Sequence, residues 1–252
     1  MANVSRAAAV VAAALALAGC EPRRAAAPSP SPSVGRPATL RFEVADADDA
    51  FDVGVTLRSR LVTYGAGPGA PTVAGRTITI EVERDVVRGD LLVLAGRGGL
   101  AFRGVVEAFP PGECAEPGTR RTLLTRAAAA PDPTRVVTCA ENGEARYELG
   151  PAEPVGKTLG AKAVESSPPT APRTWTVSMR LRPEPWAEVT GRYVGRKIAI
   201  VLDGAVWSAP TILEPITDGA VELSGSFDER RARLLAALAS SGDIDVPVKV
   251  LP

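Results

Sequence analysis

Residues 197–216 read KIAIVLDGAVWSAPTILEPI, and residues 219–227 read GAVELSGSF. The unbroken apolar run at 198–202 predicts a strand that is buried on both faces. The Asp-Gly pair at 203–204 then predicts a two-residue hairpin turn, and residues 205–209 predict the returning strand. Nothing in this stretch is typical of an active site, so it predicts a fold rather than a reaction.

Other short motifs accompany this stretch. They are YELGP at 147–151, WTVSM at 175–179, the Ser226-Phe227 pair, and LAFRGV at 100–105. Together these motifs resemble the first extracytoplasmic domain of SecD and SecDF, the accessory subunit of the bacterial protein translocase. The LAFRGV motif is similar to the strand that closes the base of that domain, and the other motifs are similar to its head subdomain.

The resemblance runs from about Thr39 to Leu251. It is strongest from Tyr147 onward and weak across residues 107–146. In SecD this domain protrudes from the outer face of the membrane and holds translocating polypeptide, while its head swings relative to the base as protons cross the transmembrane part. The resemblance therefore implies an extracytoplasmic module that binds polypeptide.

The N-terminus has the pattern of a lipoprotein signal peptide. A basic Arg6 precedes the apolar run 7–16, and LAGC follows at 17–20, which is typical of a cleavage site before a lipidated cysteine. The apolar run is too short for a bilayer span, which takes about 20 residues. We expect residues 1–19 to be removed and Cys20 to carry palmitate or similar acyl chains as a multi-chain anchor. A plain secretory signal is the alternative.

The segment after Cys20 predicts a tether. Residues 21–38 are rich in Pro, Ala and Ser and include PSPSPS at 28–33, a composition that stays extended and solvated. We therefore expect residues 20–38 to link the bilayer to the folded part. The predicted location is the extracytoplasmic face of the cell membrane, with the protein anchored to lipid through Cys20.

Composition excludes several classes of protein. The chain has 252 residues, 45% of them hydrophobic, and its 29 basic residues balance its 29 acidic residues. This balance gives no electrostatic reason to expect nucleic acid as a partner. After the N-terminal run no apolar segment approaches the length of a membrane helix, so the sequence predicts a stand-alone SecD-like domain and not a proton-driven motor.

The sequence predicts no catalytic, cofactor or metal site. It contains no histidine, which excludes a Ser-His-Asp triad and removes the commonest metal ligand. A Ser–Lys hydrolase or a paired-carboxylate glycosidase stays open, but each candidate has a structural explanation, as turn, strand, loop or core residue. The candidates are Ser178, Ser208, Asp203 and Glu214 for catalysis, and Trp186 and Trp207 for ligand contact.

Residues 150–158 read GPAEPVGKT and superficially resemble a phosphate-binding loop. Five residues separate the two glycines where the Walker motif has four, and Pro151 and Pro154 lack the N–H groups that would face a phosphate. We therefore do not expect nucleotide binding, and Lys157 is interpreted as a solvated residue at the start of a helix.

Cysteine usage predicts a disulfide. With Cys20 lipidated, Cys114 and Cys139 remain as an even pair in an oxidising compartment. Their bond would close a loop of about 26 residues and stabilise the fold by roughly 3 kcal/mol. Two unpaired thiols are the alternative. Because both residues lie within 107–146, this segment is interpreted as an insertion or long linker stapled by its own disulfide.

Residues 39–106 predict a ferredoxin-like base with the order β-α-β-β-α-β. Alternating or apolar runs indicate the strands, and capped stretches with helical spacing indicate the helices. The predicted strands are 39–44, 71–74, 77–83 and 100–106, and the predicted helices are 48–61 and 85–95.

Residues 147–252 predict an α+β head with a mainly antiparallel sheet. Besides the hairpin, we expect strands at 175–181 and 220–224 and a short helix at 186–193. A Ser226–Glu229 capping box predicts a helix that continues to Ser240. A last strand at 246–251 could pair with either module.

These patterns predict a non-catalytic module for polypeptide binding or protein export. Its expected partners are the bilayer, unfolded exported polypeptide and components of the Sec translocase. The alternative is a structural or assembly lipoprotein that binds one specific envelope partner and has no part in export. Fold alone does not separate the two.

Overall fold

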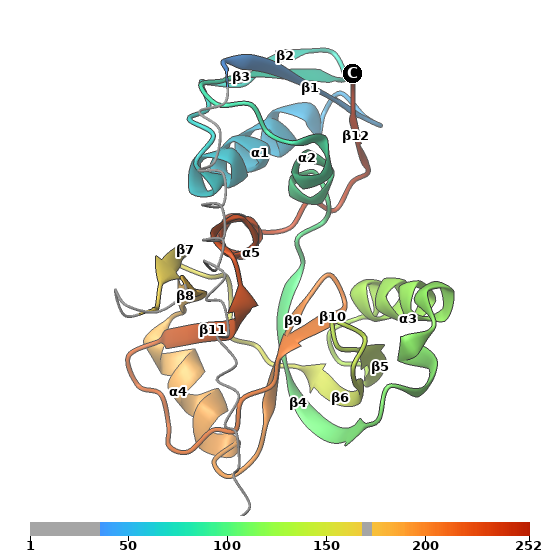
Figure 1. Cartoon of the computed structure of the whole chain (residues 1–252), viewed down its shortest axis with the longest axis vertical. Coiled ribbons are helices and arrows are strands. Elements are labelled where there is room, and N and C mark those ends of the chain that lie inside the picture. The colour runs from blue at the N-terminus through green and yellow to red at the C-terminus, as the bar shows by residue number, and fades with distance from the viewer. Residues whose placement is uncertain (1–35, 168–172) are drawn as a thin grey trace, which may run out of the picture. The chain divides into compact units, whose positions relative to one another are not determined.

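The computed structural model describes residues 36–167 and 173–252, which form three antiparallel sheets with helices packed against them (Figure 1). The predicted α+β class with mainly antiparallel pairing is confirmed. The predicted signal peptide at 1–19, Cys20 and most of the tether at 20–38 lie outside the described residues.

The first sheet belongs to a ferredoxin-like base. Its strand order is β12-β1-β3-β2, and all neighbours are antiparallel. With helices after the first and third strands, this is the β-α-β-β-α-β arrangement. The elements are β1 (Ala38–Val44), α1 (Ala50–Tyr64), β2 (Thr72–Ala74), β3 (Thr77–Val82), α2 (Arg88–Leu94) and β12 (Val248–Val250).

One strand of the predicted base is assigned wrongly. A strand does form at β4 (Leu100–Phe109), but it pairs with strands of a different sheet. The C-terminal β12 pairs with β1 and completes the base instead, with Phe42 opposite Val250. The first and the last strand of the described chain therefore pair with each other in the base, and their apolar side chains share one core.

Alternation along the base strands explains this core. Leu40 lies opposite Ile80 and Phe42 opposite Ile78, and all four side chains are buried. Strand residues two apart share a face, so these side chains form one apolar layer. Leu57 and other buried residues of α1 pack onto the same core.

The second sheet has the order β10-β9-β4-β6-β5. Segment 107–146 contributes β5 and the ends of β4 and β6 to this sheet, and it also contains α3. The interpretation as a long linker is therefore wrong, whereas the predicted disulfide within the segment is present. The disulfide between Cys114 and Cys139 joins the short η1 turn to β5, with 5.6 Å between the Cα atoms. The elements are η1 (Gly112–Ala115), α3 (Pro117–Ala129), β5 (Val136–Cys139), β6 (Arg146–Ala152), β9 (Ile198–Leu202) and β10 (Ala205–Ser208).

All five residues of β9 are buried, as the sequence predicts. Ile198, Ile200 and Leu202 join the core of the head. Ala199 and Val201 join a second cluster on the opposite face, which includes Ala127 of α3. The strand is fully apolar because a helix-covered core lies on each side of it.

The third sheet has the order β11-β8-β7. Strand β7 was not predicted, and Lys157 is an exposed loop residue before that strand, not the start of a helix. The elements are β7 (Gly160–Glu165), β8 (Trp175–Arg180), α4 (Pro183–Arg192), β11 (Ala220–Phe227) and α5 (Glu229–Ser241).

Helix α5 begins later than predicted. Its N-cap is Asp228, whose carboxylate accepts a hydrogen bond of 2.7 Å from the backbone N–H of Arg231. The predicted capping box is therefore wrong, because β11 continues through Phe227. Asp is as good an N-cap as Ser, and sequence spacing alone did not separate them.

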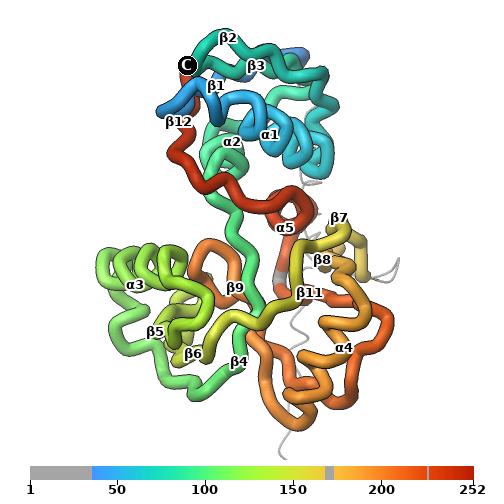
Figure 2. Tube along the Cα trace, turned by 180° about the vertical axis from the view of Figure 1, so that it is seen from behind, coloured from blue at the N-terminus to red at the C-terminus, as the bar shows by residue number. Residues whose placement is uncertain are grey.

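Helix α5 packs against both the base and the head. The described residues belong to one compact unit, and in both views α5 lies between α1 and the strands β7 and β8 (Figures 1 and 2). Ala232 and Ala236 contribute to the head core, whereas Ala237 contributes to the base core. Small side chains on opposite faces let the helix approach both layers closely.

Candidate functional site

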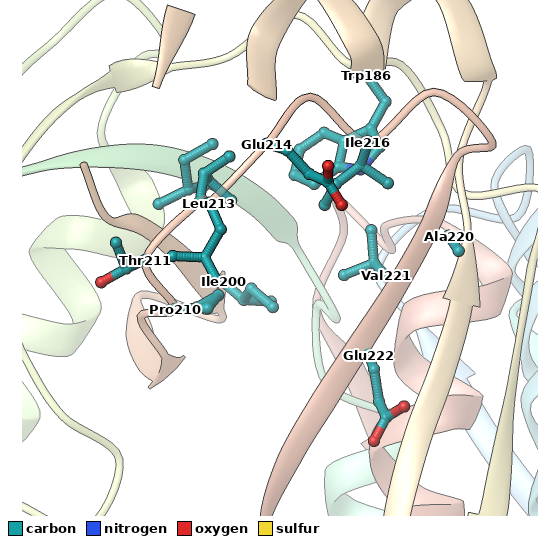
Figure 3. Close-up of a pocket in the computed structure, with 12 residues that line it drawn as sticks. Trp186, Ile200, Pro210, Thr211, Leu213, Glu214, Ile216, Ala220, Val221 and Glu222 are labelled. Atoms are coloured by element: carbon teal, nitrogen blue, oxygen red, sulfur yellow. The ribbon is translucent and has the colours of Figure 1, made fainter. Parts of the chain in front are cut away.

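An apolar pocket of about 280 Å³ opens in the head, and we call it the head pocket (Figure 3). It lies between β9, the segment that follows β10, and the start of β11. Most of its lining is aliphatic, as expected for a site that binds by burying apolar surface. The lining residues are Trp186, Ile198, Ile200, Pro210, Thr211, Ile212, Leu213, Glu214, Ile216, Ala220, Val221 and Glu222.

Trp186 of α4 is the aromatic residue that lines the head pocket. Its side chain is 2% exposed and packs on Phe102 of β4, with ring centroids 4.9 Å apart. Its indole Nε1 is buried and has no hydrogen-bond partner. A buried donor without an acceptor costs about 1–3 kcal/mol, so an acceptor supplied by a ligand would stabilise this N–H.

A hydrogen bond fixes the segment that borders the pocket. The hydroxyl of Thr190 in α4 accepts from the backbone N–H of Ile216 at 2.9 Å and donates to the carbonyl oxygen of Trp186 at 2.8 Å. Leu213, in the same segment, is 84% exposed. The pocket thus has a fixed wall at Ile216 and a solvated apolar side chain at its mouth.

Strand β11 lines the pocket with its first residues. It is an outer strand that pairs with β8, and no other strand of the described residues pairs with it. Its Val221 and Leu223 are buried in the head core, whereas Glu222 is exposed. An unpaired strand edge is a template for an extended chain, and here that edge borders an apolar pocket.

The only charged groups that line the pocket are two carboxylates. They belong to Glu214 and Glu222, and Figure 3 shows them well apart, with Glu222 at the lower end of the group of lining side chains. No Lys or Arg is among the lining residues. The pocket therefore disfavours an anionic ligand and accepts an apolar group with neutral or basic neighbours.

The candidate catalytic residues are not brought together. Asp203 forms the hairpin turn and accepts a hydrogen bond of 2.8 Å from the backbone N–H of Gly99. Glu214 lines the head pocket, Ser208 lines another pocket, and Asp203 a third. Ser178 lies within β8. This arrangement provides neither a nucleophile–base pair nor two facing carboxylates.

The loop at 150–158 holds structural contacts and not a phosphate cradle. Glu153 accepts hydrogen bonds of 2.6 Å from both the Tyr193 hydroxyl and the Arg192 guanidinium. Burial and the hydrogen bond to Glu153 raise the pKa of Tyr193 to about 12. Lys157 is exposed and lies beyond these contacts.

Trp207 lines a different pocket, of about 350 Å³. The guanidinium of Arg231 lies 5.0 Å from the centre of the Trp207 ring and also forms an ion pair with Glu141. The Arg231 guanidinium therefore covers the face of the Trp207 ring, so this tryptophan has an internal cation partner.

Two kinds of feature are absent from the described part of the chain. In residues 36–167 and 173–252, no group of three or more His, Cys, Asp or Glu side chains is placed to hold a metal ion. Over the same ranges, no helix has both the length and the apolar character needed to cross a bilayer.

Part of this site was predicted from the sequence. Trp186 and Glu214 were candidates, and Trp186 was expected to be a core residue, which it also is. The segment 210–216 was not predicted as a pocket wall. The signal was present, since an apolar run with two prolines cannot continue a paired strand and leaves apolar side chains beside the sheet.

A family model matches the part of the chain that builds this pocket, and relatives are similar over part of the chain. The family model of the SecDF P1 head subdomain matches residues 156–246. The protein translocase subunit SecD of Acidaminococcus fermentans is 47% identical over 66 residues, which cover 26% of this chain and 16% of that protein. SecDF of Thermus thermophilus is 39% identical over 77 residues, which cover 29% of this chain and 10% of that protein. The chain matches less than a fifth of the length of these relatives.

Solved structures of SecDF share the fold. One, described as a membrane component that enhances protein export, has a TM-score of 0.54 at 24% identity and covers 85% of this chain and 98% of that chain. SecDF in its super-membrane-facing form has a TM-score of 0.57 at 22% identity over 88% of this chain and 31% of that chain. These structures are similar to the chain in fold over both the base and the head. The family model adds a match in sequence for residues 156–246. Residues 156–246 therefore form a head subdomain of the SecD and SecDF type.

Proposed function

We propose that this protein is an extracytoplasmic lipoprotein whose SecD-type head binds extended polypeptide as an accessory of protein export. The observation that supports it best is the head pocket, which places aliphatic side chains and an unpaired aromatic N–H beside the free edge of β11. An extended chain offers the groups that match: main-chain amides for a strand edge and apolar side chains for a pocket.

The relatives support the same function. Residues 156–246 match the model of the SecDF P1 head subdomain, the relatives that are similar over 66 to 77 residues are named translocase subunits, and one solved relative is described as enhancing protein export. Because only the head matches in sequence, the activity of those longer proteins is carried to this chain as a proposal. The proposed module holds polypeptide without catalysing a reaction.

Binding of unfolded polypeptide tests this proposal. The full chain, purified in detergent, is titrated into a fluorescent unstructured peptide and, as a control, into a folded protein that contains the same peptide sequence. We expect saturable binding of the unstructured form at micromolar concentration and none of the folded form. Absence of saturable binding to the unstructured peptide contradicts the proposal.

The proposed anchor is an acyl-modified Cys20. Residues 17–20 have the sequence at which lipidation and cleavage occur, and two or more acyl chains give stable attachment to a bilayer. Replacing Cys20 by Ser should move the protein from the membrane fraction to the soluble extracytoplasmic fraction. The same distribution for both forms would contradict the anchor and leave polypeptide binding untouched.

A second function is favoured by a different surface. Helix α1 exposes Phe51, Val55 and Val62, with Phe51 65% exposed. At 100° per residue these positions lie on one face of the helix. Exposed Arg58 lies on the same face, so the stripe is apolar with one basic residue. Such a stripe suits contact with one folded envelope protein, which is the role of an assembly lipoprotein. Crosslinks from Phe51 to one dominant partner would favour this second function.

A further inference from the structure

We propose that Trp186 donates its indole N–H to a main-chain carbonyl of a bound polypeptide, while one aliphatic side chain of that polypeptide fills the head pocket. This inference rests on the proposed polypeptide-binding function and names the contact that performs it. It also specifies the ligand: an extended segment with an aliphatic residue and without acidic neighbours.

The donor is the first observation. Trp186 Nε1 stands apart among the described residues, since it is the buried side-chain nitrogen or oxygen atom with no hydrogen-bond partner. Indole N–H groups normally find an acceptor when buried. Trp186 is packed into the head core against Phe102 and also lines the head pocket, so a polypeptide bound in that pocket is the nearest source of an acceptor for this N–H.

The size and lining of the pocket select the side chain. Its volume of about 280 Å³ lies just below the range of about 300–1,000 Å³ for pockets that hold drug-sized ligands. Ile200, Ile212 and Val221 line it and offer only apolar atoms from their side chains. The pocket therefore suits one aliphatic side chain with its adjoining main chain and does not suit a larger cofactor.

The outer edge of β11 determines how the main chain of a bound polypeptide would run past the pocket. The pocket is bordered by Ala220 to Glu222 at the start of this outer strand. The backbone N–H of Ala220 is taken by the Asp218 carboxylate at 2.9 Å, so pairing with a ligand begins after Ala220. A chain that runs along this edge brings alternate side chains toward the pocket.

Charge selects against acidic segments. Glu214 and Glu222 line the pocket, and no basic side chain among the lining residues offsets them. A carboxylate beside the aliphatic residue of the ligand is repelled, and a lysine or arginine is attracted. This excludes a free carboxylate as the acceptor of the Trp186 N–H and leaves the neutral main-chain carbonyl.

The test uses three unstructured fluorescent peptides that differ only in their sequence around one central position. The first carries Leu with a neighbouring Lys, the second carries Ser with the same Lys, and the third carries Leu with a neighbouring Asp. Each is titrated into the full chain in detergent, into Trp186→Phe, and into Trp207→Phe as a matched control. Indole ¹⁵N–H spectra of the wild-type chain are recorded during the first titration.

We expect the first peptide to bind best and the other two to bind about tenfold more weakly or worse. Trp186→Phe should lower its affinity about three- to tenfold, the contribution of one hydrogen bond, while Trp207→Phe leaves it unchanged. The indole N–H resonance of Trp186 should move downfield on binding. This spectrum tests the hydrogen bond even if the Phe variant folds poorly.

Two results would overturn the inference. If the wild type binds the peptides, but Trp186→Phe binds equally well and the indole resonance does not move, Trp186 is not the donor, and polypeptide binding still stands. If the wild type binds none of the peptides, the inference and the proposed function fail together.

Discussion

Arg60 of α1 and Gly242, the residue after α5, are joined by a hydrogen bond of 2.8 Å from Arg60 Nη2 to the carbonyl oxygen of Gly242. The Arg60 side chain is fully buried and also donates to the carbonyl oxygens of Leu94, Gly96 and Arg97, at and after the end of α2. One guanidinium therefore satisfies acceptors at the C-terminal ends of two helices. Burial lowers its pKa to about 10, against attraction from Asp203 and Asp243.

Replacing Arg60 by Met should lower the free energy of unfolding by about 3–5 kcal/mol, because one buried and three partly buried carbonyl groups lose their donor at once. Arg60→Lys should lie between wild type and Met, since an ammonium has three donors in place of five. Urea denaturation measures both. Arg58→Met is the matched control, because Arg58 is exposed with one hydrogen bond to Gly69, and its loss should stay within about 0.5 kcal/mol. Equal effects at Arg58 and Arg60 would contradict this role.

Asp90 of α2 gives the fold an acid-sensitive contact. Burial pushes its pKa up, but hydrogen bonds from Arg230 and from the Tyr64 hydroxyl at 2.6 Å outweigh burial and hold the pKa below the ordinary value. The stability that Asp90 contributes is fully present above the unfolded-state pKa of about 3.9. It is lost as the pH falls through the lower pKa of the folded state.

Asp90→Asn should cost about 1–3 kcal/mol at neutral pH, toward the lower end because Arg230 stays solvated. The difference from wild type should shrink as the pH falls below about 4. Urea titrations at several pH values measure it. Glu188→Gln is the control, since Glu188 forms an exposed i,i+4 pair with Arg192, worth about 0.3–0.5 kcal/mol. A difference that stays constant from neutral to acid pH would exclude the proposed contribution.

Gly204 lies at the tip of the hairpin against α3. Its φ of +79° is left-handed, and a Cβ atom there would overlap with the carbonyl oxygen of Leu124. Gly204→Ala should cost about 3 kcal/mol or more from strain and overlap together. Gly156 is the control, because its φ is +73° and an added Cβ would have open space within 4 Å. Gly156→Ala should cost about 1 kcal/mol. Thermal or urea unfolding measures both. Equal decreases in the free energy of unfolding would show that α3 does not restrict the space at the turn.

The disulfide between Cys114 and Cys139 should stabilise the second sheet. Replacing both cysteines by Ala should lower the free energy of unfolding by about 3 kcal/mol, the value for a closed loop of this length. Binding at the head pocket should not change, because neither cysteine lines that pocket. A thiol count on the denatured, non-reduced protein checks the bond first. Two free thiols would contradict the pairing.

Local sequence patterns predicted most helices and strands, but they did not predict which strands pair across long sequence distances. The β9–β10 hairpin was predicted because apolar runs and an Asp-Gly turn specify it within a few residues. The assignment of β4 to the base was wrong, and the pairing of β12 with either module was left open, because nothing local shows which sheet each strand joins. Segment 107–146 was misread because its Pro and Gly content hides α3, which has Ala127 as its buried residue.

The candidate site was predicted only in part for a similar reason. Trp186 could be recognised as an aromatic residue on a helix, but whether its N–H has an acceptor depends on the fold around it. The pocket wall at 210–216 and the outer position of β11 depend on contacts between segments that are distant in sequence. Family resemblance supplied the expectation of polypeptide binding, and the three-dimensional structure supplied the pocket on which the proposed contact is based.

The most direct test of polypeptide binding by the head is photo-crosslinking in native membranes. A photo-reactive amino acid replaces Leu213 at the mouth of the head pocket or, in a second protein, Phe51 on the apolar face of α1. We predict that position 213 captures many unrelated exported chains, together with translocase subunits, and that position 51 does not. One dominant folded partner at position 213, or no exported chain at all, would contradict the account.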